Sequence, residues 1–194
     1  SLSLGFDYKV KNLDNNKKIK GEKFSFSLGQ IISAKENPDL PSKSTLNEKL
    51  SDVLGNISLN LNENTKFSSN FKIDQNLEEF NQSQYGLDII YPKMNFNINY
   101  LEERKHLGNQ KYVETKAGLN FDKTKLSLSG KRNLLSNSSE FYDLTYEYLN
   151  DCLKAGIAFR REFYRDRDLE PEDTLMFKIT FSPLGDISSP TFNQ

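Results

Sequence analysis

The chain has almost no cysteine, no tryptophan and no long apolar segment. Its 194 residues include one Cys, one His, six Pro and no Trp. One cysteine cannot form a disulfide within the chain, so we expect Cys152 either to be a small buried apolar residue or to pair with a segment outside this sequence. No run of 18 apolar residues occurs, which excludes a transmembrane helix. The protein is then either soluble or crosses a membrane with strands.

An excess of charge of one sign is also missing. The formal net charge is -1, with 26 Lys and Arg residues against 27 Asp and Glu residues. Without a basic surface, no binding to nucleic acid is predicted. The first ten residues, SLSLGFDYKV, lack the basic and apolar segments of a signal peptide and open directly in a strand pattern. We therefore expect this sequence to be a fragment of a longer chain.

The sequence contains no arrangement typical of an enzyme. His106 is the sole histidine, and it lies in a charged segment beside Glu102 and Arg104. We expect a solvated loop side chain there rather than the base of a Ser-His-acid triad. Acidic groups at residues 78–79 and 170–173 have the residue types of calcium ligands, but solvated loop charge is the simpler interpretation. We predict no catalytic residue, no metal and no cofactor.

Alternation of apolar and polar residues is the main pattern in the sequence. The apolar fraction is 36%, with 14 Phe and 9 Tyr, and these aromatic residues fall at alternating positions, which argues against disorder. Between Glu140 and Gly185 three runs alternate in this way, as in Tyr142, Leu144 and Tyr146. A period of two places alternate side chains on opposite faces of a β-sheet. Runs of about 10–14 residues exceed an ordinary strand and fit a strand tilted across a membrane.

The rest of the chain repeats this unit, giving about eleven strands and no helix, since the apolar spacing is two rather than three and four. The earlier strands are predicted at residues 2–11, 22–33, 50–61, 66–74, 84–91, 95–101, 112–121 and 125–134. Connections after the third, fifth, seventh and ninth strands are short, and those after the even-numbered strands are longer. This alternation is typical of an outer-membrane barrel, with short periplasmic turns and longer outer loops. A soluble β-sandwich gives the same alternation with its apolar faces turned inward, but strand length and loop asymmetry favour the membrane.

Several stretches of the sequence resemble one known family. Residues 148–161 (YLNDCLKAGIAFRR), residues 166–173 (DRDLEPED) and Leu175–Phe177 are similar to the end of the LptD family of outer-membrane proteins that assemble lipopolysaccharide (LPS). Residues 24–30 (FSFSLGQ), Leu40–Pro41 and residues 51–55 (SDVLG) resemble an earlier part of the same barrel. Together these stretches span most of the chain.

The resemblance implies a fold, a function and partners. The fold is a very large antiparallel transmembrane β-barrel, near the top of the known range of strand numbers; residues 1–185 are its C-terminal portion and residues 186–194 a short tail. The function is insertion of LPS into the outer leaflet of the outer membrane of a Gram-negative cell. The implied partners are LPS, outer-membrane lipid, a lipoprotein plug in the lumen (LptE) and a periplasmic bridge protein of the transport system. A passive porin-like barrel and a soluble β-sandwich binding module are the alternatives.

The resemblance also implies roles for particular residues. The final strand would form a lateral gate for LPS, and its residues are Leu175, Phe177, Lys178, Ile179 and Phe181. The family carries adjacent cysteines where this chain has Asp151 and Cys152, so Cys152 would form a disulfide with a periplasmic domain outside this chain. Beside these roles, four arginines near the long-loop end are candidates to bind LPS phosphates, because arginine binds phosphate through two hydrogen bonds: Arg160, Arg161, Arg165 and Arg167. Ion pairs within the loop are the alternative.

Overall fold

The computed structural model describes residues 1–13, 19–40, 45–104, 108–163, 172–181, 185–188 and 192–193. This part of the chain contains thirteen strands: β1 (Leu2–Leu13), β2 (Ile19–Ile32), β3 (Val53–Asn62), β4 (Thr65–Ile73), β5 (Phe80–Tyr91), β6 (Met94–Glu103), β7 (Gln110–Asn120), β8 (Thr124–Asn133), β9 (Ser138–Leu149), β10 (Leu153–Glu162), β11 (Glu172–Phe181), β12 (Gly185–Ser188) and β13 (Phe192–Asn193). Across these ranges no helix has the length and apolar character needed to cross a membrane.

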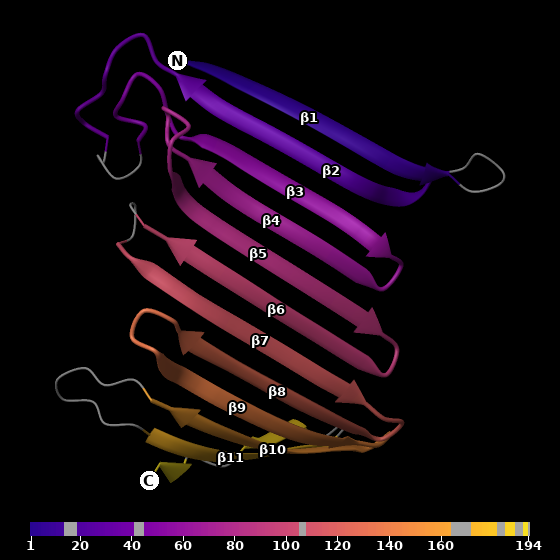
Figure 1. Cartoon of the computed structure of the whole chain (residues 1–194). Coiled ribbons are helices and arrows are strands. Elements are labelled where there is room, and N and C mark those ends of the chain that lie inside the picture. The colour runs from indigo at the N-terminus through magenta and orange to yellow at the C-terminus, as the bar shows by residue number, and fades with distance from the viewer. Residues whose placement is uncertain are drawn as a thin grey trace. The chain divides into compact units, whose positions relative to one another are not determined.

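Strands that follow one another in the sequence are neighbours in the sheet. The order runs from β1 to β12 without a crossover, as Figure 1 shows for β1 to β11. The last strand, β13, pairs with β11. The strand pairs whose register is defined are antiparallel. The prediction of an all-β antiparallel sheet is confirmed. In the described ranges β1 pairs with β2 alone, so the described strands form an open sheet.

The observed strands differ from the predicted ones at several boundaries: β2 begins at Ile19 rather than residue 22, β3 begins at Val53 rather than residue 50, and β5 differs most. β5 begins at Phe80, whereas the sequence pattern predicts a start at Gln84. The extension forms because the carbonyl of Asn81 accepts a hydrogen bond from the backbone N–H of Arg104, at 2.9 Å. Beyond β11, residues of the predicted tail form the short strands β12 and β13, which the sequence pattern does not predict.

The strands group into two compact units. Unit 1 comprises residues 1–88 and 99–111, and unit 2 comprises residues 89–98 and 112–194. In unit 1 the register aligns one apolar row across four strands: Val10, Phe24, Leu59 and Phe67. In unit 2 it aligns a second row across β8 to β11: Leu128, Leu144, Phe159 and Leu175. Because register partners share a face, each unit has one face of mainly apolar side chains (the apolar face) and one of mainly polar side chains (the polar face).

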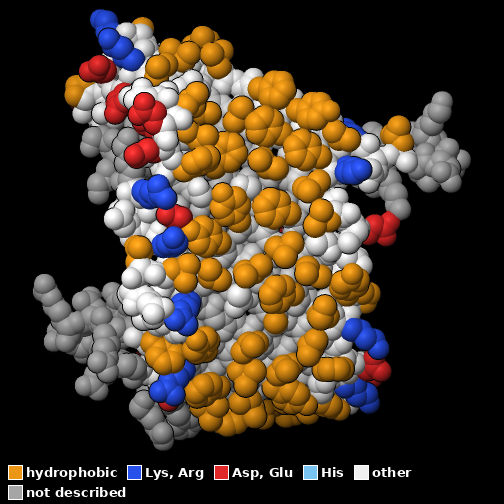
Figure 2. All heavy atoms as spheres, in the orientation of Figure 1, with side chains coloured by type: hydrophobic (Ala, Val, Ile, Leu, Met, Phe, Trp, Pro, Cys, Tyr) orange, Lys and Arg blue, Asp and Glu red, His pale blue; other side chains and the backbone are white. Residues whose placement is uncertain are grey.

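Among the residues that the structure describes, neither unit has a buried apolar core. No apolar side chain in the described ranges is buried; Phe6 is 56% exposed and Leu144 is 44% exposed. The buried side chains are polar instead: Ser25, Thr45, Ser51, Asp52, Ser69, Asn81 and Glu103. Figure 2 shows hydrophobic side chains spread over the strands of the visible face. A β-sandwich buries its apolar faces between two sheets, so the burial pattern seen here is the inverse of a sandwich.

One contact on the apolar face requires a glycine. Gly55 on β3 and Phe71 on β4 are register partners. The Phe71 ring lies over Gly55 so closely that a Cβ at residue 55 would fall 2.0 Å from the ring carbon Cζ. Phe71 also meets Phe80 edge-on, with the ring centroids 6.1 Å apart. Glycine has no side chain to cover its own backbone, so the ring of Phe71 shields the backbone of Gly55 from solvent.

We predict that Gly55→Val destabilises the folded protein by about 1–3 kcal/mol, because the new side chain must displace the Phe71 ring. The control is Gly21→Val, since a Cβ at Gly21 meets no atom within 4 Å. Urea unfolding of both variants in detergent micelles measures the difference. Equal midpoints for the two variants would contradict the packing described for Gly55.

Candidate functional site

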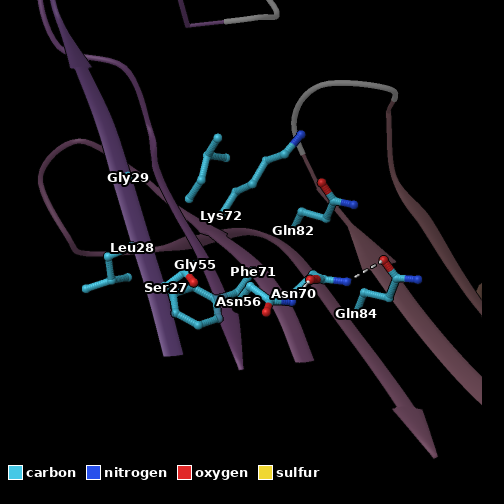
Figure 3. A pocket seen from close by; sticks show the side chains of 11 residues that line it. Ser27, Leu28, Gly29, Gly55, Asn56, Asn70, Phe71, Lys72, Gln82 and Gln84 are labelled. Atoms are coloured by element: carbon cyan, nitrogen blue, oxygen red, sulfur yellow. Dashed lines mark hydrogen bonds between the residues drawn. The ribbon is translucent and has the colours of Figure 1, made fainter. Parts of the chain in front are cut away.

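A row of amide side chains crosses the polar face of unit 1. Asn56, Asn70 and Gln84 lie on β3, β4 and β5, with their side chains in line (Figure 3). Asn56 Nδ2 donates to Asn70 Oδ1, and Asn70 Nδ2 donates to Gln84 Oε1 at 3.5 Å. Each amide carries two donor hydrogens and an acceptor oxygen with two lone pairs. The row can therefore also bind a ligand rich in hydroxyl or charged oxygen groups.

A hollow of about 560 Å³ lies beside this row (Figure 3). Its lining includes the hydroxyl of Ser27, the ammonium of Lys72 and the amide of Gln82. The small residues Ser27 and Gly29 leave space on β2, and Leu54 adds an apolar patch. Leu28 and Phe71 also line the hollow, so it offers both hydrogen-bonding groups and apolar surface.

Buried polar side chains fix the loop between β2 and β3. Ser51 Oγ accepts a hydrogen bond from the N–H of Ile31 at 2.9 Å, and the N–H of Asp52 donates to Thr45 Oγ1 at 3.1 Å. Asn81 Nδ2 donates to Asp52 Oδ2 at 2.8 Å and so ties the loop to the start of β5. The sequence predicts Ser51 and Asp52 within a strand at residues 50–61; they lie instead in the loop, because their side chains bond to β2 and β5, and β3 begins at Val53. The one signal for the network is the family-like stretch SDVLG, which contains Ser51 and Asp52.

Ion pairs join neighbouring strands on the polar face of unit 2. Arg160 donates to both oxygens of Asp143: Nε to Oδ1 at 2.7 Å and Nη2 to Oδ2 at 3.2 Å. Ser129 Oγ donates to Asp143 Oδ2 at 3.2 Å. The ammonium of Lys154 lies 3.1 Å from Glu147 Oε1. Arg160, one of the predicted phosphate ligands, thus lies on the polar face and is engaged by a carboxylate.

Arg161 lies on the opposite, apolar face, because its register partner is Tyr142. Its Nε is 3.5 Å from Asp173 Oδ1. Its guanidinium carbon is 5.2 Å from the centroid of the Phe163 ring, within the range of a cation–π contact. Two further predicted phosphate ligands, Arg165 and Arg167, lie outside the described residues, as does His106.

Cys152 occupies the tight turn between β9 and β10. The N–H of Asn150 donates to the carbonyl of Leu153 at 2.7 Å, which closes the turn. Cys152 is exposed and forms no disulfide in this chain. The interpretation of Cys152 as a small buried apolar residue is therefore wrong. A disulfide with a segment outside this chain stays a prediction.

β11 presents the predicted gate residues on both faces. Four of them share the apolar face: Leu175, Phe177, Ile179 and Phe181. Lys178 lies on the polar face, opposite Gly156 of β10. The second edge of β11 pairs with the tail: residues 178–181 with β12, and residues 174–175 with β13.

The acidic groups singled out in the sequence do not form a metal site in the described ranges. There, no three His, Cys, Asp or Glu side chains lie together in a way that could hold an ion. Glu78 and Glu79 are exposed in the turn before β5. Residues 170 and 171 of the second acidic group lie outside the described residues.

A comparison with protein families gives one match. A family model described as LptD, LPS transport system D, matches residues 1–133 of the chain. This segment covers β1 to β8 and contains the stretches FSFSLGQ and SDVLG. The C-terminal stretch at residues 148–177 lies beyond the match. No curated protein matches the chain.

We predict that the Arg160–Asp143 pair contributes less than about 1 kcal/mol to folding, because both side chains remain accessible to water. A double-mutant cycle with Arg160→Ala and Asp143→Ala, followed by urea unfolding, measures the coupling free energy. The coupling should weaken further as salt is raised. A coupling above about 2 kcal/mol that salt does not change would show a rigid pair in which Arg160 is not available to an anionic ligand.

Proposed function

The chain belongs to the LptD family of LPS transport proteins, and from this premise we propose that it forms part of an outer-membrane β-barrel that inserts LPS into the outer leaflet. The family is one of transport and assembly proteins, so the chain is proposed to act without catalytic chemistry. The proposal rests on one structural observation together with the family: apolar side chains are exposed on a sheet whose buried side chains are polar.

The exposed apolar face is proposed to contact the lipid of the membrane. In water, a contiguous apolar face of this kind drives association or aggregation. In a bilayer, the hydrocarbon core covers it without cost, while the backbone groups are paired between strands. β3 to β11 have 9 to 12 residues each, and a tilted transmembrane strand needs about 9–11. Strand length and surface chemistry support the same placement.

The barrel is proposed to be completed by strands outside this chain. β1 pairs with β2 alone among the described strands, so its other edge is available to an upstream strand. We assign residues 1–185 to the C-terminal portion of the barrel and residues 186–194 to a tail. An edge left open in a membrane carries unpaired N–H and C=O groups, which is why the remaining strands are required.

The polar face is proposed to line the lumen. The amides of Asn56, Asn70 and Gln84 and the hollow beside them supply hydrogen-bonding groups for the sugars of LPS or for the plug lipoprotein LptE. A passive porin would also have a polar lumen, and the family distinguishes the two functions. A β-sandwich module is disfavoured because the described strands belong to one sheet.

β11 is proposed as the movable side of a lateral gate. Leu175, Phe177, Ile179 and Phe181 would face the membrane, and Lys178 would face the lumen. A lipid that leaves sideways must separate the two strands at which the barrel closes (the seam). The hydrogen bonds of this seam have to break while the hairpins on either side stay folded. The edge of β11 is paired by short tail segments only, which supports its role as the weak seam.

Cys152 is proposed to form a disulfide with the periplasmic domain of the same protein. The β9–β10 turn that carries it is short and exposed, as periplasmic turns of outer-membrane barrels are. The periplasm is oxidising, so a disulfide there persists. The periplasmic bridge protein of the transport system would approach from this side.

We predict that locking β11 stops LPS delivery. A cysteine at Phe177 or Lys178, joined by oxidation to a cysteine on the first strand of the complete barrel, holds the seam shut. LPS arriving at the cell surface should then fall to the level of cells depleted of the protein, and reduction of the bridge should restore it. Normal delivery with the seam cross-linked excludes the gate. Normal delivery in depleted cells excludes the proposed function itself.

We predict that Cys152→Ser removes a reduction-sensitive shift in the mobility of the complete protein on denaturing gels. The exposed thiol has no partner cysteine in this sequence, so the shift reports the bridge to another segment. The matched control is Asp151→Ser, which changes the same turn and keeps the thiol. If the wild-type protein migrates identically with and without reductant, the disulfide does not exist.

A further inference from the structure

Charged residues on the apolar face gather at the end that carries the long loops. In β3 to β11 the charged residues that share the apolar face are Glu102, Lys111, Arg132, Arg161 and Asp173. Each is one residue away from the end of its strand that adjoins a long loop. At the short-turn end the same face presents apolar and aromatic side chains, such as Leu126, Tyr146 and Phe181. The apolar face is therefore asymmetric, with ionic groups at one membrane boundary.

In unit 1 these ionic groups form a cluster around Glu102. Tyr100 donates its hydroxyl to Glu102 Oε2 at 2.6 Å. Arg104 donates Nε and Nη2 to Glu102 Oε1, at 3.1 Å and 3.0 Å. The ammonium of Lys111 lies 3.7 Å from Glu102 Oε2. One carboxylate thus holds two cations and a hydroxyl, which leaves the cluster with a net charge of +1.

The two cations of this cluster are accessible, although the carboxylate is largely covered. The side chain of Glu102 is 23% exposed, whereas those of Arg104 and Lys111 are 58% and 37% exposed. Glu102 therefore orients the cations without enclosing them. A guanidinium and an ammonium held side by side can share one phosphate, the guanidinium through a pair of hydrogen bonds and the ammonium as a point charge.

An aromatic wall adjoins the cluster on the same face. Tyr100, which donates to Glu102, stacks on Tyr85 with centroids 6.0 Å apart, and Tyr85 stacks on Phe67 at 6.4 Å. The wall gives an apolar surface next to a cationic end, which fits an amphiphile with an anionic headgroup. Unit 2 repeats the combination: Arg161 beside Asp173, with Phe163 and Tyr142 in edge-to-face contact at 5.5 Å.

We propose that Arg104 and Lys111 bind a phosphate group of an LPS molecule whose acyl chains lie along the Phe67–Tyr85–Tyr100 wall, on the outside of the barrel. This inference rests on the proposed function, since the long-loop end reaches the outer leaflet only if the apolar face spans the outer membrane. It adds a site that holds LPS against the outer surface, separate from the lumen and from β11. Glu102 is a positioning residue that keeps the two cations together.

The test measures lipid bound to the complete protein after extraction from outer membranes in mild detergent. LPS per protein, determined by native mass spectrometry, should fall about fivefold for each cation removed in Arg104→Gln and Lys111→Gln. The control is the double variant Lys116→Gln with Lys154→Gln, whose cations pair with carboxylates on the polar face at 2.9 Å and 3.1 Å. This control changes the net charge as much as the double variant of the cluster and should retain its LPS.

Delivery of LPS to the cell surface, measured in the same strains, separates this inference from the proposed function. Normal delivery with reduced bound LPS supports the site. Undiminished LPS on the cluster variants, or wild-type protein that carries glycerophospholipid instead of LPS, overturns it while the function stands. If the double variant does not fold, Arg104→Lys keeps the charge and removes the two-pronged geometry. Bound LPS must then fall, and retention at the wild-type level overturns the site.

Discussion

Backbone pairing between neighbouring strands is the constraint on which the rest of the structure depends. With no apolar side chain buried in the described ranges, side-chain packing cannot hold the sheet together as it does in a water-soluble domain. The ladders from β1 to β12 take that role. In lipid a peptide group has no water to bond, so each strand must be fully paired along its length. Long strands joined in sequential hairpins satisfy this requirement directly.

The two faces of the sheet differ in their side-chain chemistry, and the proposed function places water on the polar face and lipid on the apolar face. On the polar face, amides and ion pairs such as Arg160–Asp143 link strands through contacts that are individually weak in water and can be exchanged. On the apolar face, neighbouring strands are joined by close packing of side chains instead, as where the Phe71 ring lies over Gly55. In the proposed barrel, the ionic cluster around Glu102 lies where that face meets the membrane boundary. The proposed function divides in the same way, with passage on the polar side and contact with lipid on the apolar side.

The sequence contained most of the fold, because a period of two and a hairpin order are local properties. It predicted all eleven long strands and the polarity of the faces, and the family match agrees with the resemblance seen in residues 24–30 and 51–55. It did not predict that β5 starts at Phe80, since that depends on a hydrogen bond to Arg104, far away in the sequence. Adjacent arginines were grouped as one candidate site, although alternation sends Arg160 and Arg161 to opposite faces. The Glu102 cluster joins two strands across a loop, and spacing alone does not reveal it.

The tail strands set a condition on how the proposed barrel can be completed. An edge offers a single line of N–H and C=O groups, so residues 174–175 and 178–181 of β11 cannot pair with β12 and β13 and with an incoming strand at once. Completion is therefore a strand exchange, in which each hydrogen bond lost to the tail is replaced by an equivalent one. Such an exchange changes the enthalpy little and never bares a long row of peptide groups. In the proposed gate, the barrel opens and closes along β11, and β12 and β13 pair with that edge while it is open.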